Sequence, residues 1–105
     1  IFGVELNGDA YAEVRQRKEV SMCLKADFLN DVIISQHAFS FVFMNPPYGR
    51  NADGERYEMM FLRKAIPYLT KEAVMVVVIP HYVASEDDFC REWCRSFETA
   101  YIPFS

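Results

Sequence analysis

The sequence lacks a long hydrophobic run. None of its apolar stretches approaches the roughly 20 residues that a helix needs to cross a bilayer. Its first residues do not follow the charged, apolar and small-residue order of a secretory signal peptide. Its three cysteines, Cys23, Cys90 and Cys94, are an odd number at uneven spacing, which is typical of reduced thiols. We therefore expect a cytoplasmic protein with no membrane among its partners.

Basic charge is also scarce. Lysine and arginine number 11 against 15 aspartates and glutamates, so the formal net charge is −4. This balance argues against broad electrostatic binding of nucleic acid by the chain alone, and a nucleic-acid substrate would need basic surface from elsewhere. The composition, 51% hydrophobic and 25% charged, is that of an ordinary globular protein. A length of 105 residues suits one domain but is short for a complete doubly wound one.

The chain is organised around residues 41–49. Residues 41–44 are apolar on both faces of an extended chain, which predicts a buried strand. Pro46 and Pro47 cannot donate to a sheet ladder, so the strand must end before them. Asn45 therefore falls at the carboxyl end of a probable central strand, the edge at which open α/β sheets bind ligands.

The turn after this strand presents groups suited to holding an amine. The prolines restrict the residues before them, so Asn45 and Pro46 are expected to be extended, with the side-chain oxygen of Asn45 and the backbone oxygen of Pro46 facing one point. Two converging acceptors suit a group with two N–H donors, such as an exocyclic amine. Tyr48 offers a flat face for stacking a planar ring, and Gly49 allows the backbone to turn sharply. The competing interpretation is a plain strand-ending turn.

The segment Asn45-Pro46-Pro47-Tyr48 resembles the catalytic motif of amino-methyltransferases that use S-adenosylmethionine, and most closely that of the adenine-specific (N6) DNA methyltransferases. The resemblance implies that Asn45 and Pro46 accept hydrogen bonds from the adenine N6 amino group, and that Tyr48 stacks on a base flipped out of DNA. It implies S-adenosyl-L-methionine as cofactor and DNA as substrate. Because an RNA base or a protein glutamine amide offers a similar N–H pair, each stays open as an alternative.

Two acidic residues occupy comparable positions earlier in the chain. Glu5 ends the expected strand at residues 1–6, where an acid in nucleoside-binding folds accepts the ribose hydroxyls. The resemblance gives Glu5 the same role. It also implies that Asp27 accepts the amino group of the cofactor adenine, that the backbone N–H of Phe28 meets a ring nitrogen, and that Asn45 belongs to the cofactor site. The competing interpretations are a solvated carboxylate for Glu5 and a helix cap for Asp27.

The remaining pattern alternates strands and helices. Strands are expected at residues 1–6, 20–26, 41–44, 73–79 and 101–104, helices at 9–18, 57–70 and 87–98, and a helical turn at 32–37. Such alternation predicts an α/β fold, a partial doubly wound (Rossmann-like), mostly parallel sheet of a class I methyltransferase. Residues 50–56 are expected to form a mobile surface loop, either plainly solvated or with Arg50 and Arg56 reaching phosphates.

Side-chain spacing predicts how the longer helices pack. The buried face of the helix at 57–70 should consist of Tyr57, Phe61, Ala65 and Tyr68. That of the helix at 87–98 should consist of Phe89, Trp93 and Phe97. Ser85 is expected to cap the latter helix. Cys90 and Cys94 are expected to be buried thiols, because no further ligands for a metal are evident near them.

One part of the resembling family has no counterpart here. The sequence has four glycines and no Gly-x-Gly, whereas the family's first strand and Gly-rich turn cradle the methionine part of the cofactor. That strand normally lies between the strand of Glu5 and the strand of Asn45. We therefore expect residues 1–105 to be a partial methyltransferase domain, a fragment whose exposed sheet edges favour association between copies. A non-catalytic nucleotide-binding or scaffold domain is the remaining alternative.

Overall fold

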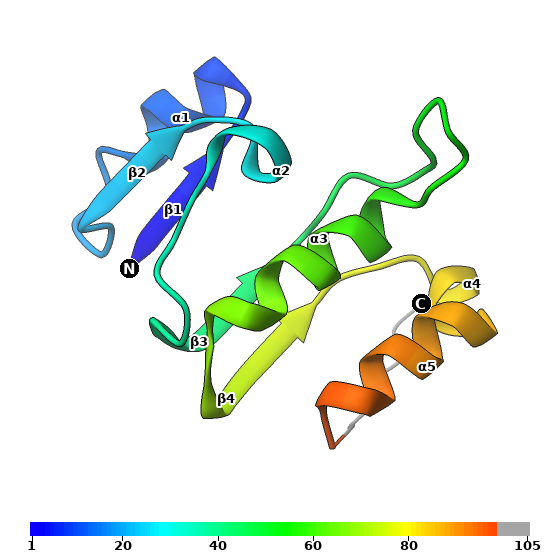
Figure 1. Cartoon of the computed structure of the whole chain (residues 1–105). Helices are drawn as coiled ribbons and strands as arrows, with labels where there is room; N and C mark the ends of the chain where they lie inside the picture. The colour runs from blue at the N-terminus through cyan, green and yellow to red at the C-terminus, as the bar shows by residue number, and fades with distance from the viewer. Residues whose placement is uncertain (99–105) are drawn as a thin grey trace. The chain divides into compact units, whose positions relative to one another are not determined.

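The computed structural model describes residues 1–98 as alternating strands and helices (Figure 1). In order they are β1 (Phe2–Glu5), α1 (Gly8–Val14), β2 (Met22–Lys25), α2 (Phe28–Asp31), β3 (Phe39–Met44), α3 (Tyr57–Ala65), the 3₁₀ turn η1 (Ile66–Tyr68), β4 (Leu69–Val77), α4 (His81–Ala84) and α5 (Asp87–Ser96). No helix within this range is long and apolar enough to span a membrane. The strand expected at 101–104 lies outside the described residues.

The strands form two separate parallel pairs. β1 pairs with β2, and β3 pairs with β4. In each pair the connection between the two strands contains a helix, α1 in the first pair and α3 in the second. The predicted α/β class and parallel pairing are therefore confirmed, but the described residues do not form one continuous sheet. The break separates the strand of Glu5 from the strand of Asn45, which are the two strands that the resemblance would join through a strand missing from this sequence. The chain accordingly divides into two compact units, Ile1–Ile34 and a second that begins at Ser35.

In the first unit, side-chain caps decide where the helices begin. The Asn7 side chain accepts hydrogen bonds from the backbone N–H groups of Asp9 and Ala10, which starts α1. The Asp27 side chain accepts from Leu29 and starts α2. The helical turn expected at 32–37 is therefore wrong, because the cap starts the helix one turn earlier and the chain is already extended at Val32.

In the second unit, one face of the β3–β4 pair is open. Val42 and Met44 point to the covered face, whereas Phe41 and Phe43 are 58% and 63% exposed. Side chains alternate between faces, and the register sets Phe43 beside Val76, itself 40% exposed. The prediction of a strand buried on both faces is wrong for the described residues, because the helices of this unit cover only one face of the strand pair.

Pro67 shortens the helix expected at 57–70. α3 ends at Ala65, the chain continues for one 3₁₀ turn that contains Pro67, and β4 begins at Leu69, four residues before the expected start at residue 73. The fully or nearly buried residues of α3 are Glu58, Leu62 and Ala65. Of the predicted stripe only Ala65 is among them, since Tyr57, Phe61 and Tyr68 are half-buried.

The segment after β4 holds two helices where one was expected. Ser85 ends the short helix α4, where its hydroxyl donates to the carbonyl of His81, so its predicted role as the cap of α5 is wrong. Phe89 of α5 is buried, and its ring stacks on that of Trp93. Cys90 and Cys94 are exposed, contrary to prediction, because they lie one position beyond Phe89 and Trp93 on a helix covered on one side only.

Candidate active site

The Asn45–Tyr48 turn lies where the sequence places it, directly beyond β3. The N–H of Val78 donates to the carbonyl of Met44 at 2.9 Å, so β4 runs beside β3 to the last residue before the motif. Pro46 is buried, while Asn45 and Tyr48 are exposed, the latter to 53%. Pro46 therefore packs inside the protein, whereas the amide of Asn45 and the ring of Tyr48 are accessible to solvent.

Within the turn, the two exposed side chains meet. The Tyr48 hydroxyl donates to Oδ1 of Asn45 at 3.5 Å, at the outer limit of a hydrogen bond. An amide oxygen has two lone pairs, so Asn45 keeps capacity for a stronger donor. Within residues 1–98 the carbonyl oxygen of Pro46 accepts no hydrogen bond. Both acceptors named from the sequence are therefore open to an incoming N–H.

Gly49 ties the turn to helix α3. Its φ of +118° lies in the region that side chains rarely adopt, so a glycine is required there. Its N–H donates to Oε1 of Glu58 at 3.2 Å, and its carbonyl accepts the N–H of Tyr57 at 2.9 Å. The first turn of α3 therefore holds the end of the motif at two backbone atoms.

Glu58 is a site residue that sequence reasoning missed. It is fully buried, and no hydrogen bond from residues 1–98 reaches its Oε2, which lies 4.0 Å from Nη1 of Arg56. A buried carboxylate is costly unless it is paired, so its retention beside the motif indicates a structural role there. In the sequence it is an acidic residue in the first turn of a helix, where an exposed dipole partner is the ordinary expectation. Nothing in the pattern marked it for burial.

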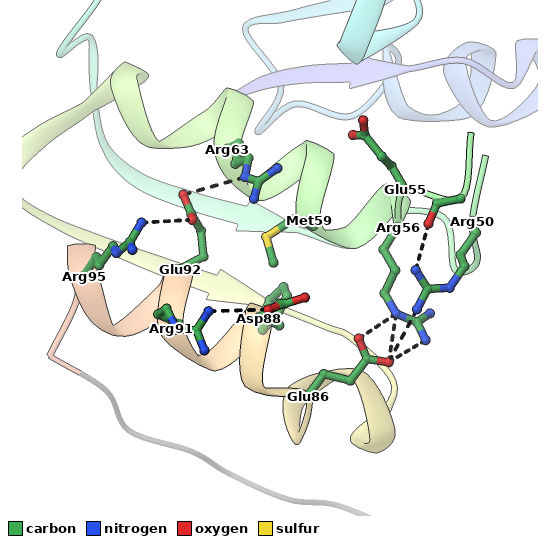
Figure 2. A pocket seen from close by; sticks show the side chains of 12 residues that line it. Arg50, Glu55, Arg56, Met59, Arg63, Glu86, Asp88, Arg91, Glu92 and Arg95 are labelled. Carbon is green, nitrogen blue, oxygen red and sulfur yellow. Dashed lines mark hydrogen bonds and ion pairs between the residues drawn. The ribbon is translucent and has the colours of Figure 1, made fainter. Parts of the chain in front are cut away.

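Arg56 continues this chain of contacts to the start of α5. Its Nε donates to both carboxylate oxygens of Glu86, at 3.1 and 2.9 Å, and its Nη2 donates to Oε1 at 2.6 Å (Figure 2). The hydrogen bond from Arg56 lowers the pKa of Glu86, and the same bond raises the pKa of Arg56. The guanidinium also lies 5.4 Å from the ring centre of Tyr82. Arg56 is thus engaged within the protein, contrary to the interpretation that it reaches phosphates.

Residues 50–56 form a closed hairpin. Arg50 and Arg56 face each other as an antiparallel bridge, and Nη1 of Arg50 donates to the carbonyl of Gly54 at 2.8 Å. Inside the hairpin the Asn51 side chain accepts from the N–H groups of Asp53 and Glu55, both at 2.9 Å. The expected surface loop is therefore confirmed as exposed, and it takes the form of a hairpin closed at its base by the bridge between Arg50 and Arg56.

The acidic residues predicted for the cofactor lie together in the first unit. Glu5 ends β1, Lys25 pairs with it in β2, and Asp27 follows two residues later, so the two acids occupy the carboxyl ends of neighbouring parallel strands. Oε1 of Glu5 accepts the N–H of Asn7 at 3.0 Å. Phe28 is the first residue of α2 and is half-buried. The structure brings these three residues to one edge of a sheet.

Asp27 is a helix cap, as the competing interpretation held. Its Oδ1 accepts the N–H of Leu29 at 2.9 Å, and its Oδ2 accepts the side-chain amide of Asn30 at 2.8 Å. Both carboxylate oxygens of Asp27 are thus engaged within the first turn of α2. No group of three or more potential metal ligands is present among residues 1–98.

The predicted residues thus form two groups. Glu5, Asp27 and Phe28 belong to the first compact unit, and Asn45 to Tyr48 belong to the second. No curated protein and no solved structure matches the chain. A family described as an uncharacterised methyltransferase family (DUF6094) matches residues 1–102. Because this match spans nearly the whole sequence, the chain belongs to this family of methyltransferases.

Proposed function

We propose that the chain transfers a methyl group from S-adenosylmethionine to an exocyclic amine, and that this amine is adenine N6 of DNA. The observation that carries the proposal is the Asn45–Tyr48 turn, which presents two open acceptors and an exposed aromatic ring directly beyond a parallel strand. Membership of a methyltransferase family supports methyl transfer, and the choice of adenine in DNA rests on the resemblance of the motif.

The turn acts by orientation. The Asn45 side-chain oxygen and the Pro46 carbonyl accept the two N–H groups of the amine, which directs its lone pair away from them and holds it for attack. The same two oxygens stabilise the positive charge that develops on nitrogen as the methyl group is transferred. The exposed ring of Tyr48 stacks on the base, and no strong general base is needed for this step.

The acidic edge of the first unit fits the adenosine part of the cofactor. Glu5 and Asp27 lie at the ends of adjacent parallel strands, and both present carboxylate oxygens, which are acceptors suited to hydroxyl and amino groups. Glu5 would accept from the ribose hydroxyls and Asp27 from the adenine amino group. When bound, S-adenosylmethionine supplies an electrophilic methyl group. The methionine part needs a Gly-rich turn that residues 1–105 lack, so we propose that another segment supplies it.

The test measures cofactor binding and methyl transfer separately. Calorimetry with S-adenosylmethionine is performed on this chain and on a chain extended upstream. Methyl transfer to adenine-containing DNA is then measured for the binding-competent form, for Asn45→Ala, and for Gln36→Ala as a matched loss of an exposed amide. We expect Asn45→Ala to lose methyl transfer while it retains cofactor binding through Glu5 and Asp27, even though Asn45 borders the cofactor, and Gln36→Ala to keep both.

Three results would redirect the proposal. Normal methylation by Asn45→Ala would remove the turn from the chemistry. Methylation of RNA or of a protein glutamine amide in place of DNA would keep the chemistry and change the substrate. Failure of both chains to bind S-adenosylmethionine would mean that Glu5 and Asp27 were misassigned, and would favour the non-catalytic scaffold alternative.

A further inference from the structure

Five of the seven arginines in the chain line one depression of the second unit. They are Arg50, Arg56, Arg63, Arg91 and Arg95. The depression has a volume of about 340 Å³ and lies between the hairpin at 50–56, α3 and α5 (Figure 2). We call it the arginine groove. No lysine lines it, so its positive charge comes entirely from planar guanidinium groups, the side chains best suited to phosphate oxygens.

The acidic side chains of the groove do not cancel this charge. Glu86 serves both Arg50, at 3.9 Å, and Arg56, at 2.6 Å. Glu92 is likewise shared, between Arg63 at 3.8 Å and Arg95 at 3.9 Å. Each of these carboxylates therefore neutralises one of the two guanidiniums that approach it.

Two further acids line the groove, and the balance stays positive. Asp88 pairs with Arg91 at 3.5 Å, while the carboxylate of Glu55 points away from the pair formed by Arg56 and Glu86 (Figure 2). Even with Glu55 counted, the lining has five arginines against four acids, one net positive charge in a chain whose total is −4. A fifth acid, Glu58, lies 4.0 Å from Arg56 but is fully buried and does not line the groove.

The guanidiniums of Arg63, Arg91 and Arg95 take part in long, exposed ion pairs that can change partners, whereas Arg50 also donates to the carbonyl of Gly54 at 2.8 Å. Only the Arg56–Glu86 pair is hydrogen-bonded with most of the arginine side chain covered, at 14% exposure. The other ion pairs are 3.5 to 3.9 Å long, and their arginine side chains are 53 to 69% exposed. Exposed pairs of this kind contribute little to stability, so a stronger anion can replace the carboxylates at small cost.

We propose that the arginine groove binds the phosphate backbone of the nucleic-acid substrate. Arg50, directly after Gly49, begins the groove at the motif turn, and Arg63, Arg91 and Arg95 continue it along α3 and α5. This inference rests on the proposed function and deepens it, because it says how an acidic chain holds a polyanion. Arg56 braces the groove through Glu86 and is not one of the phosphate contacts.

The test is a salt titration with paired variants. Binding of short fluorescein-labelled single-stranded DNA is followed by fluorescence anisotropy between about 50 and about 200 mM salt. Arg91→Gln/Arg95→Gln removes two groove charges one helical turn apart. Arg15→Gln/Arg17→Gln removes two charges from the end of α1 in the first unit and is the matched control.

Each phosphate contact adds about 0.7 to the salt slope for a single strand, so the groove variant should lose about 1.4 of slope and bind about tenfold or more weakly at the lowest salt. The control should match the wild type. Arg91→Lys/Arg95→Lys keeps the charges and should keep the slope while losing part of the affinity. Circular dichroism on every variant checks that α5 remains folded.

The outcomes separate this inference from the function it rests on. If the wild type methylates DNA but the groove variant keeps its affinity and slope, or the control loses as much, the groove assignment is overturned and the proposed function stands. If DNA binding depends on the groove but no methyl transfer occurs, the groove stands and the function falls. Groove-dependent binding of an acidic phosphopeptide, with no binding of DNA or RNA, overturns the nucleic-acid assignment.

Discussion

Replacing Glu58 should destabilise the second unit by an amount that depends on whether the new side chain can still accept a hydrogen bond. In Glu58→Ala the N–H of Gly49 loses its acceptor, and the atoms beyond Cβ leave a cavity beside Leu62 on the buried face of α3. A hydrogen bond to a charged group contributes about 1.5 to 3 kcal/mol, and the lost methylene adds about 0.8 kcal/mol. Relief from burying a partly unsatisfied carboxylate offsets part of this sum.

We therefore expect Glu58→Ala to lower the free energy of unfolding by about 2 to 4 kcal/mol. Glu58→Gln keeps an oxygen for Gly49, exchanges a charged acceptor for a neutral one and loses the 4.0 Å ion pair with Arg56, so it should cost about 1 kcal/mol. The difference of about 2 kcal/mol corresponds to roughly 10 °C in Tm for a domain of this size.

Urea unfolding followed by tryptophan fluorescence measures this difference. Trp93 is the only tryptophan, and its ring lies against Phe89 and Phe97 with centroids 6.3 and 4.5 Å away, so its emission reports on the packing of α5. Equal destabilisation by alanine and glutamine would refute the reasoning, because it would show that the negative charge, and not the hydrogen bond to Gly49, is what the fold requires.

Three further predictions concern other parts of the chain. Asp27→Asn should keep α2, because asparagine is an equally good cap, yet weaken S-adenosylmethionine binding about tenfold by calorimetry; unchanged affinity would leave Asp27 as a cap alone. The lowered pKa of Glu86 means that its pairing with Arg56 stabilises the fold above the ordinary carboxyl pKa of 4.5 and ceases to do so as the pH falls through the lowered value. Acid unfolding of Glu86→Gln should lack this component, and identical acid transitions for variant and wild type would contradict it. Phe43→Thr should change the free energy of unfolding of this chain by less than about 1 kcal/mol, because Phe43 is 63% exposed; a loss above about 3 kcal/mol in urea unfolding would mean that the open face of β3 is covered in solution.

The sequence was sufficient where one local rule decides the structure. The apolar run before Pro46 predicted a strand that ends at Met44. The acids after two other apolar runs predicted residues at strand ends, and Glu5 and Asp27 are found there. Prolines and strand ends act through the backbone of their own segment, so no knowledge of the tertiary structure is needed.

The sequence was insufficient where burial depends on what lies opposite a side chain. Phe43 belongs to an apolar run and is nevertheless exposed, because the strand pair has helices on one face only. Glu58 is charged and nevertheless fully buried, because the N–H of Gly49 needs an acceptor. Arg56 was expected to be open to solvent, but Glu86, 30 residues later, holds it. Each of these outcomes depends on a tertiary contact, which the spacing of apolar residues along the chain does not predict.

The most direct test of the central claim is identification of the methylated product. Adenine-containing DNA is incubated with S-adenosylmethionine and the cofactor-binding form of the protein, digested to nucleosides and analysed by mass spectrometry. The account predicts N6-methyladenine with the wild type and with Gln36→Ala, and none with Asn45→Ala. A methylated nucleoside that forms equally with Asn45→Ala, or cofactor binding by the wild type without methylation of adenine, would contradict it.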